Sequence, residues 1–215
     1  GLTTAQIAAM STAQVAALES TDLATLSAKQ VAGLTSEQVA ALTVTQMAGV
    51  TTAQLKALNT SQVSGLGSTQ IGVLTTSQVK GLTSAQIAIL TTGQLKGMTS
   101  SQLGALVVAQ EVGLTSEQVA TLTTTQLAGM SAVQVTALNA TQVGGLSSAQ
   151  IAALTTAQFV GFEPKDLALL TVGGQLNGLT TDQLAAMSKA QLNALSSEQV
   201  GSLSVTQIGA LGSSQ

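Results

Sequence analysis

Residues 2–9 read LTTAQIAA and residues 34–41 read LTSEQVAA, and this eight-residue pattern recurs along nearly all of the 215-residue chain. Each octad has the form Leu, Thr or Ser, any residue, any residue, Gln, Val/Ile/Leu, small, small. One residue is inserted within residues 170–178, after which the period resumes at Leu179. A fixed short period is typical of a repeat protein, whose stacked repeats share one continuous core.

The octad carries two signals that start an α-helix. Thr3 followed by Gln6 is a capping box, in which each side chain bonds to a free backbone N–H of the other residue. Leu2 and Ile7 then stand at the two places of a hydrophobic staple. Because the next cap follows eight residues later, each helix has only about one and a half turns. Helices this short are unstable alone, so the octads must stack.

We therefore predict an all-α solenoid of very short helices, with one octad per helix. Glycine recurs at the eighth place every 16 residues, as at Gly33, Gly49 and Gly65. Glycine after a helix suits a left-handed stop, so we expect two octads (16 residues) per coil, with one glycine corner of positive φ. The first-place and sixth-place residues form the expected core, and Thr, Ser, Ala and Gln form the surface. The array runs continuously over residues 1–215, with irregular octads at 106–113 and 170–178.

The alternative fold is a β-solenoid, also with about 16 residues per coil. Thr, Val and Ile favour strands. Strands, however, alternate apolar and polar residues with a period of two. Here the large apolar residues are spaced five and three apart. We therefore favour helices.

The composition argues against several classes of function. The chain has no His and no Cys, and only 7% of its residues are charged. Acid–base catalysis usually needs His or a tuned carboxylate, and a hydroxyl nucleophile needs an adjacent base. No phosphate loop, metal-ligand cluster or dinucleotide fingerprint is present. We expect no enzymatic activity, no cofactor and no metal. Six scattered basic residues predict no nucleic-acid binding, and interrupted apolar runs predict no transmembrane segment.

Two octads replace the Thr and Gln of the cap with acidic residues. They contain Glu19 with Asp22, and Glu163 with Asp166. We interpret them as variant caps that complement the helix dipole. Pro164 follows at the first helical position, where proline is favoured. The alternative is an acidic site for a cation, which would need six or more oxygen ligands.

The octad at residues 106–113 reads LVVAQEVG. Val107 removes the cap, and Glu111 occupies a sixth-place core position. Because a buried unpaired carboxylate is costly, we expect a register slip that turns Val112 inward and Glu111 outward. The alternative is an irregular contact patch made by Val107, Val108 and Glu111.

Two smaller features have local interpretations. The inserted residue within TVGGQ, residues 171–175, indicates a bulged corner or a kink. Asn59 and Asn139 begin glycosylation sequons but also stand at cap places. Asn is a good cap, and we interpret both residues as caps.

The ends of the chain fall inside octads: Gly1 is an eighth-place residue and Gln215 a fifth-place residue. Solenoids usually carry a polar capping repeat at each end, and neither end has one. We expect an open apolar face at each end, so that the array is either cut from a longer one or stacks on identical subunits. A head-to-tail contact that does not close generates a filament. The candidate self-assembly residues are Gly1, Leu2, Ile7, Ile208 and Leu211.

The stretches LTTAQIAAM from Leu2, LTSEQVAAL from Leu34 and LSSAQIAAL from Leu146 resemble octad repeats of large bacterial surface and secreted proteins. These proteins are often described as adhesin-like or filamentous. The resemblance implies an extracellular structural or adhesive role and supplies no functional residues. Three hypotheses follow: a self-assembling filament or surface-layer protein, a spacer or stalk segment of a giant adhesin, and an ice-binding protein. On an extracellular chain, the many Thr and Ser residues are also candidates for O-glycans.

Overall fold

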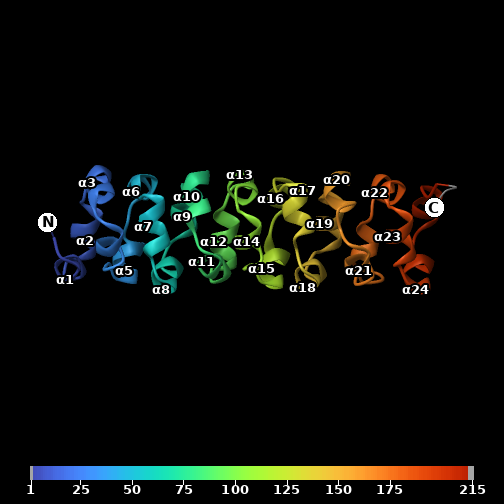
Figure 1. Ribbon diagram of the computed structural model, residues 1–215, viewed down its shortest axis with the longest axis horizontal. Coiled ribbons are helices and arrows are strands. Elements are labelled where there is room, and N and C mark those ends of the chain that lie inside the picture. The colour runs from blue at the N-terminus through green and yellow to red at the C-terminus, as the bar shows by residue number, and fades with distance from the viewer. Residues whose placement is uncertain (1, 213–215) are drawn as a thin grey trace. The chain divides into compact units, whose positions relative to one another are not determined.

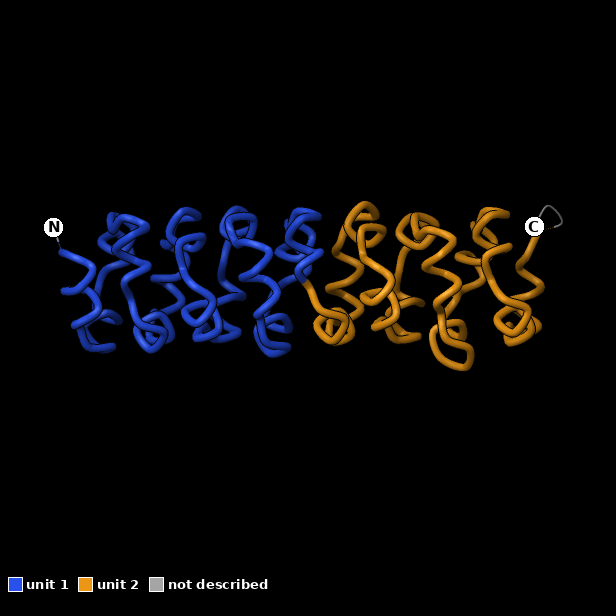
Figure 2. The backbone as a smooth tube through the Cα atoms, turned by 60° about the horizontal axis from the view of Figure 1, so that its bottom comes forward, with its two compact units in different colours: residues 1–113 blue, residues 114–215 orange. Residues whose placement is uncertain are grey.

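The structure, a computed structural model, describes residues 2–212, and over this range its regular elements are short helices in chain order (Figure 1). The chain divides into two compact units, residues 1–113 and residues 114–215 (Figure 2). The prediction of short helices with one octad per helix is confirmed. The β-solenoid alternative is wrong, because residues 2–212 form no strand.

Each helix has only four to six residues. In unit 1 the helices are α1 (Thr4–Ala8), α2 (Thr12–Ala16), α3 (Ser20–Thr25), α4 (Ala28–Val31), α5 (Ser36–Ala40), α6 (Val44–Gly49), α7 (Thr52–Ala57), α8 (Thr60–Ser64), α9 (Ser68–Gly72), α10 (Thr76–Gly81), α11 (Ser84–Ala88), α12 (Thr92–Gly97), α13 (Ser100–Gly104) and α14 (Val108–Glu111). In unit 2 they are α15 (Ser116–Thr121), α16 (Thr124–Ala128), α17 (Ala132–Thr136), α18 (Ala140–Gly144), α19 (Ser148–Ala153), α20 (Thr156–Phe159), α21 (Pro164–Leu167), the 3₁₀-helix η1 (Gln175–Gly178), α22 (Thr181–Ala186), α23 (Lys189–Asn193), α24 (Ser197–Gly201) and α25 (Val205–Gly209).

The capping box of the octad starts nearly every helix. At α1, the Gln6 backbone N–H donates to Thr3 Oγ1 at 3.2 Å, and the Thr3 backbone N–H donates to Gln6 Oε1 at 2.8 Å. The same pair of bonds recurs at α11, between Thr83 and Gln86. These bonds satisfy backbone donors that a helix start leaves free. The predicted caps are confirmed, Asn59 and Asn139 included.

The Gln side chain has a second role that links successive turns of the solenoid. Gln86 Nε2 donates to the carbonyl oxygens of Leu55 and Leu58, at 2.9 and 2.7 Å. In unit 2, Gln150 Nε2 donates in the same way to Val119 and Leu122. The Gln residues from Gln38 to Gln207 are buried. The expectation that Gln lies on the surface is therefore wrong, because its amide saturates carbonyls that the solenoid buries.

One turn of the solenoid contains between three and four octads. The closely packed helices are three helices apart, as with α5 and α8 in unit 1 or α16 and α19 in unit 2 (Figure 1). The Gln amide bonds span 28 and 31 residues. A turn therefore holds about 28 residues, and the prediction of two octads (16 residues) per coil is wrong.

The glycines recur for a different reason from the one the sequence suggested. Gly65 and Gly145 end their helices with φ of −72° and −78°, so the expected positive-φ corner is wrong. A Cβ added at Gly145 would lie 2.6 Å from the Ser116 carbonyl oxygen, and one at Gly113 would lie 2.5 Å from the Ser84 carbonyl oxygen. Glycine at these places allows close approach to the backbone of the preceding turn.

The apolar core follows the octad. The sixth-place residues, such as Val39, Leu55 and Ile71, are completely buried, and most first-place residues, such as Leu58 and Leu74, are nearly so. Burying one such side chain stabilises the fold by about 1.5–3 kcal/mol. This burial, repeated every octad, is what holds helices that are too short to persist alone.

The inserted residue is accommodated in a corner. Gly173 has a φ of +73°, the one positive value among the described residues. Gln175 accepts from the Thr171 N–H across four residues instead of three, and its amide still reaches the carbonyls of Val143 and Leu146. The corner is bulged, as predicted, and the bonds between turns continue through it.

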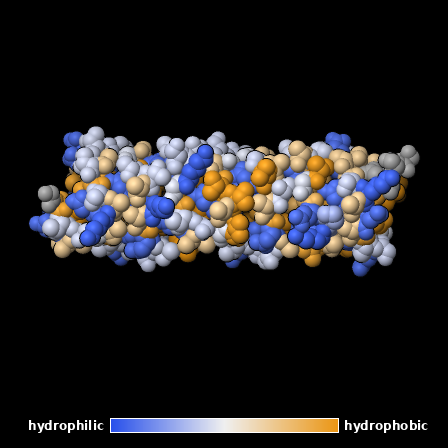
Figure 3. All heavy atoms as spheres, viewed as in Figure 1, coloured by the Kyte–Doolittle hydropathy of each residue, from blue (hydrophilic) through white to orange (hydrophobic). Residues whose placement is uncertain are grey.

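The face of the molecule in Figure 3 mixes hydrophilic and hydrophobic residues. No helix formed by residues 2–212 combines the length and the hydropathy that crossing a bilayer requires.

Candidate functional site: the two end surfaces

The first turn of unit 1 exposes its first-place side chains. Leu2 is 45% exposed, and Met10, Leu18 and Leu26 are only partly buried. From Leu34 to Leu203 the first-place residues are buried. First-place side chains therefore face the preceding turn, and among residues 2–212 nothing covers those of the first turn.

The Gln amides also point toward the preceding turn. Gln38 Nε2 donates back to the carbonyls of Ile7 and Met10, at 2.9 and 2.7 Å. Gln6 and Gln14 accept their cap bonds in the same way as other octads. Their side chains are exposed, and their Nε2 groups donate to none of the described residues. The N-terminal end surface thus carries both apolar side chains and free amide donors.

A pocket of about 270 Å³ hollows this N-terminal end surface. Its lining includes the first-place residues Leu2, Met10, Leu18 and Leu26. The pocket is therefore mostly apolar, and an aliphatic side chain of another turn would fill it.

The last turn of unit 2 exposes the opposite half of the octad. Sixth-place Ile208 is 42% exposed, and sixth-place Leu192 and Val200 are only partly buried. First-place Leu195 and Leu203 remain buried. The C-terminal end surface therefore presents the groups that, inside each unit, the next turn covers.

The candidate self-assembly residues divide between these two surfaces and their surroundings. Leu2 lies on the N-terminal end surface, and Ile208 and the partly buried Leu211 lie on the C-terminal end surface. Ile7 is buried beneath the first of them, and Gly1 lies outside the described residues.

Sequence reasoning missed several members of the end surfaces. They are Met10, Leu18, Leu26, Gln6 and Gln14 at one end, and Leu192 and Val200 at the other. A 16-residue coil places one or two octads at each end, whereas the observed turn places three to four there. Knowing the length of the turn would have identified these residues, but the octad pattern alone does not give that length.

The irregular octad keeps its register, so the expected register slip is wrong. Gln110 accepts from the Val107 N–H at 2.9 Å, and its amide donates to the Val79 carbonyl at 2.9 Å. These bonds fix α14 in the ordinary orientation. Glu111 is consequently 1% exposed, and Val112 is 55% exposed. Val107 and Val108 are both exposed, whereas Glu111 lies beneath them.

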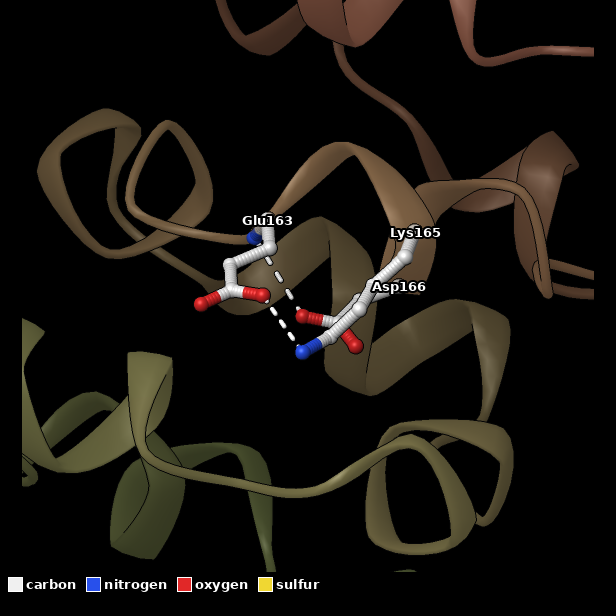
Figure 4. Close-up of polar contacts among 3 residues, drawn as sticks. All are labelled: Glu163, Lys165 and Asp166. Atoms are coloured by element: carbon white, nitrogen blue, oxygen red, sulfur yellow. Dashed lines mark hydrogen bonds and ion pairs between the residues drawn. The ribbon is translucent and has the colours of Figure 1, made fainter.

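The octad of Glu163 caps its helix only in part, and the octad of Glu19 shows no side-chain cap bond. The side chains of Glu19 and Glu163 accept no cap bond. Asp166 Oδ2 accepts from the Glu163 N–H at 3.2 Å, which is the half of the capping box that Gln supplies elsewhere (Figure 4). Lys165 Nζ lies 2.5 Å from Glu163 Oε2, and this bond raises the pKa of Lys165.

The Asp166 carboxyl is itself buried at 3% exposure. Burial raises its pKa, and the hydrogen bond from the Glu163 backbone partly opposes that change. Across residues 2–212, no three His, Cys, Asp or Glu side chains gather into a cluster that could hold a metal ion.

A family model described as the ALTTAQ repeat matches residues 15–52, 47–76 and 176–213. The chain is a tandem-repeat protein. The matched segments together cover a little less than half of it. The irregular octad at residues 106–113 and the acidic octad at residues 162–169 lie outside them. The letters TTAQ of the family name occur at residues 51–54. They include the cap residue Thr51 and Gln54, which form a capping box like those described above. A comparison with curated proteins gave no match.

Proposed function

We propose that this chain is an extracellular structural repeat protein that stacks end to end on copies of itself to build a filament or surface layer. One observation carries the proposal: each internal turn presents first-place residues and Gln amides to the turn before it, and sixth-place residues to the turn after it, so a copy of the array could continue the same contact. Inside each unit, these two halves of the octad cover one another from turn to turn.

The proposed contact repeats the interaction between successive turns. Leu2 and Met10 of one copy would cover Ile208 and Val200 of another. The exposed amide of Gln6 would donate to backbone carbonyls of the last turn, as buried Gln amides do within the chain. Because the two surfaces differ, each added copy leaves a new free end, and growth continues.

The role and the location rest on different observations. The chain has no His and no Cys, which supports a structural role without catalysis. The resemblance of its octads to those of bacterial surface and secreted proteins supports an extracellular location and a role in adhesion or scaffolding. The Thr and Ser hydroxyls outside the caps are proposed sites of O-glycans, which a mass above the 21.3 kDa of the polypeptide would reveal.

The test is sedimentation of the purified 215-residue chain over a range of concentrations, together with electron microscopy. We expect assembly that grows with concentration. Leu2→Glu or Ile208→Glu should prevent it, because each places a charge in an apolar contact. Val133→Glu is the matched control: Val133 is highly exposed in α17, away from both end surfaces.

Two results would contradict the proposal. A chain that stays monomeric at high concentration has no end-to-end contact, and discrete short particles would favour the spacer or stalk of an adhesin. Assembly that Leu2→Glu and Val133→Glu reduce equally would place the contact elsewhere on the surface.

A further inference from the structure

The octad at residues 162–169 departs from the pattern at the place that links turns. Asp166 stands where other octads have Gln, and its side chain is one methylene shorter. Asp166 Oδ2 takes the cap bond, as Gln Oε1 does elsewhere. Oδ1 therefore occupies the position of the amide donor, but an ionised carboxylate only accepts hydrogen bonds. Oδ1 is buried and has no hydrogen-bond partner.

The carbonyls of the preceding turn lack their usual donor at this place. The neighbouring Gln158 donates to the Leu127 and Met130 carbonyls, 31 and 28 residues earlier. The equivalent carbonyls for Asp166 belong to Val135 and Leu138. Asp166 offers those carbonyls no side-chain N–H, and its own Oδ1 is left without a partner. A buried acceptor of this kind is unfavourable unless a positive or donating group lies beside it.

A pocket lies at this position. Its volume is about 420 Å³, and its lining includes Leu138, Asn139, Glu163, Lys165 and Asp166. The shorter Asp side chain and its two carboxylate oxygens distinguish it from the same place in other octads. The single cationic group of the lining is Lys165, which is 73% exposed and paired with Glu163 (Figure 4).

We propose that this pocket binds a hard divalent cation of the calcium type, held by Asp166 Oδ1, the Glu163 carboxylate and the Leu138 carbonyl oxygen. Water completes the coordination. Ca²⁺ accepts such a mixed and irregular set of carboxylate, carbonyl and water oxygens, whereas Mg²⁺ demands a near-ideal octahedron. The pocket offers no sulfur or imidazole ligand, so it does not suit softer transition metals.

The charges of the pocket suit a divalent ion. Two carboxylates would face the cation, and Lys165 would release Glu163 and turn into the solvent that already surrounds it. Burial raises the pKa of Asp166, so a bound cation would favour the ionised carboxylate that burial disfavours. With few protein ligands, we expect a dissociation constant of about 10⁻⁴–10⁻³ M, the range of extracellular calcium modules.

The second acidic octad provides an internal comparison. Glu19 and Asp22 have the same spacing as Glu163 and Asp166. Asp22, however, is exposed, because it belongs to the first turn and has no preceding turn beneath it. The acidic spacing alone therefore does not make the site; the buried Oδ1 and the opposing carbonyls do.

The experiment is a CaCl₂ titration of the ¹⁵N-labelled full chain, followed by amide shifts at constant ionic strength. We expect saturable shifts confined to the amides near Leu138 and Asp166. In Asp166→Gln, which restores the octad pattern, these shifts should disappear and affinity should fall at least about tenfold, since the main carboxylate ligand is gone. Lys165→Gln should tighten binding, because it removes the competing ammonium group.

Asp182→Asn is the matched control, since it removes an exposed carboxylate of the same unit at α22 and should leave the titration unchanged. MgCl₂ at equal concentration should give weaker shifts. The proposal is overturned if the wild-type shifts do not saturate, or if Asp166→Gln binds Ca²⁺ as tightly as the wild type does. Because Asp166→Gln retains the folded octad pattern, its loss of binding would not reflect unfolding.

Discussion

Gln86 Nε2 lies 2.7 Å from the carbonyl oxygen of Leu58, a residue 28 positions earlier and one turn of the solenoid away. The Oε1 atom of the same side chain accepts from the backbone N–H of Thr83 at 2.7 Å. One amide therefore both starts its own helix and attaches it to the turn before. Few other side chains have this donor and acceptor pair in one planar group, which accounts for the regular presence of Gln at the fifth place.

Replacing Gln86 should cost more than the loss of a cap. In Gln86→Ala, the Thr83 N–H and the Leu58 carbonyl lose this partner, and the Leu55 carbonyl keeps only its bond from the Leu58 N–H. We expect the free energy of unfolding to fall by about 2–4 kcal/mol, because buried polar groups without partners are costly. Denaturant unfolding measures this change.

Gln14→Ala is the matched control for that prediction. Gln14 makes the cap bond, but its side chain is exposed and reaches no preceding turn. Its loss should cost about 0.5–1 kcal/mol, in the range of a single capping interaction. Equal losses for Gln86→Ala and Gln14→Ala would mean that the bonds between turns contribute nothing to stability.

Replacing two neighbouring glycines of unit 2 by alanine should change the stability of the fold in opposite directions. A Cβ at Gly145 would lie 2.6 Å from the Ser116 carbonyl oxygen, whereas one at Gly144 would meet nothing within 4 Å. Gly144 is the last residue of α18, so Gly144→Ala should stabilise the fold by about 0.4–1 kcal/mol.

Gly145→Ala should destabilise the fold by about 1–3 kcal/mol, the usual cost of overpacking. Thermal unfolding of the two variants, recorded side by side, provides the comparison. A stabilising Gly145→Ala would show that the turns are not in close contact at this place.

The buried carboxyl of Glu111 should be a point of weakness in unit 1. It occupies a sixth-place position that Val, Ile or Leu fills in neighbouring octads, at 1% exposure. Glu111→Val restores the octad pattern and should raise stability by about 1–3 kcal/mol, because apolar packing avoids the desolvation cost that a buried carboxylate carries even where it has partners. Glu198→Val, at an exposed place, should have little effect. If Glu111→Val destabilises the protein, the contacts of the Glu111 carboxyl outweigh the cost of burying it.

Asp166 should make the stability of unit 2 depend on pH in a defined direction. Burial raises the folded-state pKa of this carboxyl above its ordinary value of 3.8. A group of this kind favours the folded state most at pH below 3.8, and the contribution is lost as pH rises through the folded pKa. Asp166→Asn should therefore gain stability relative to the wild type as pH rises from 3 toward neutrality, measured in chelator. A pH-independent difference would contradict burial of the ionised group.

Much of the fold follows from a single octad. The cap of Thr3 and Gln6, the staple places of Leu2 and Ile7, and the all-helical class were all predictable, because each depends on residues within eight positions. The length of the turn was not predictable in this way. It depends on how Gln86 meets Leu58 across 28 residues, and local patterns do not encode such distances.

The same limit explains what was missed at the candidate sites. Sequence reasoning placed Glu111 outward to avoid burying its charge, but the bonds of Gln110 on both sides fix the helix and turn it inward. The acidic pair of Glu163 and Asp166 was recognisable, whereas the burial of Asp166 depends on the turn beneath it. Whether such a side chain is buried depends more on the turn packed against it than on its residue type.

The bulge at Gly173 shows that the fold tolerates an inserted residue. Its extra residue is confined to one corner, and the amide of Gln175 still reaches Val143 and Leu146. Adding or removing a whole octad would disturb even less, because nearly every octad offers a Gln amide to the turn before it and the same carbonyls to the turn after it. Unequal recombination within the coding repeats should then change the length of the protein without unfolding it, so that homologous loci in different strains are expected to vary in octad number far more than in octad sequence.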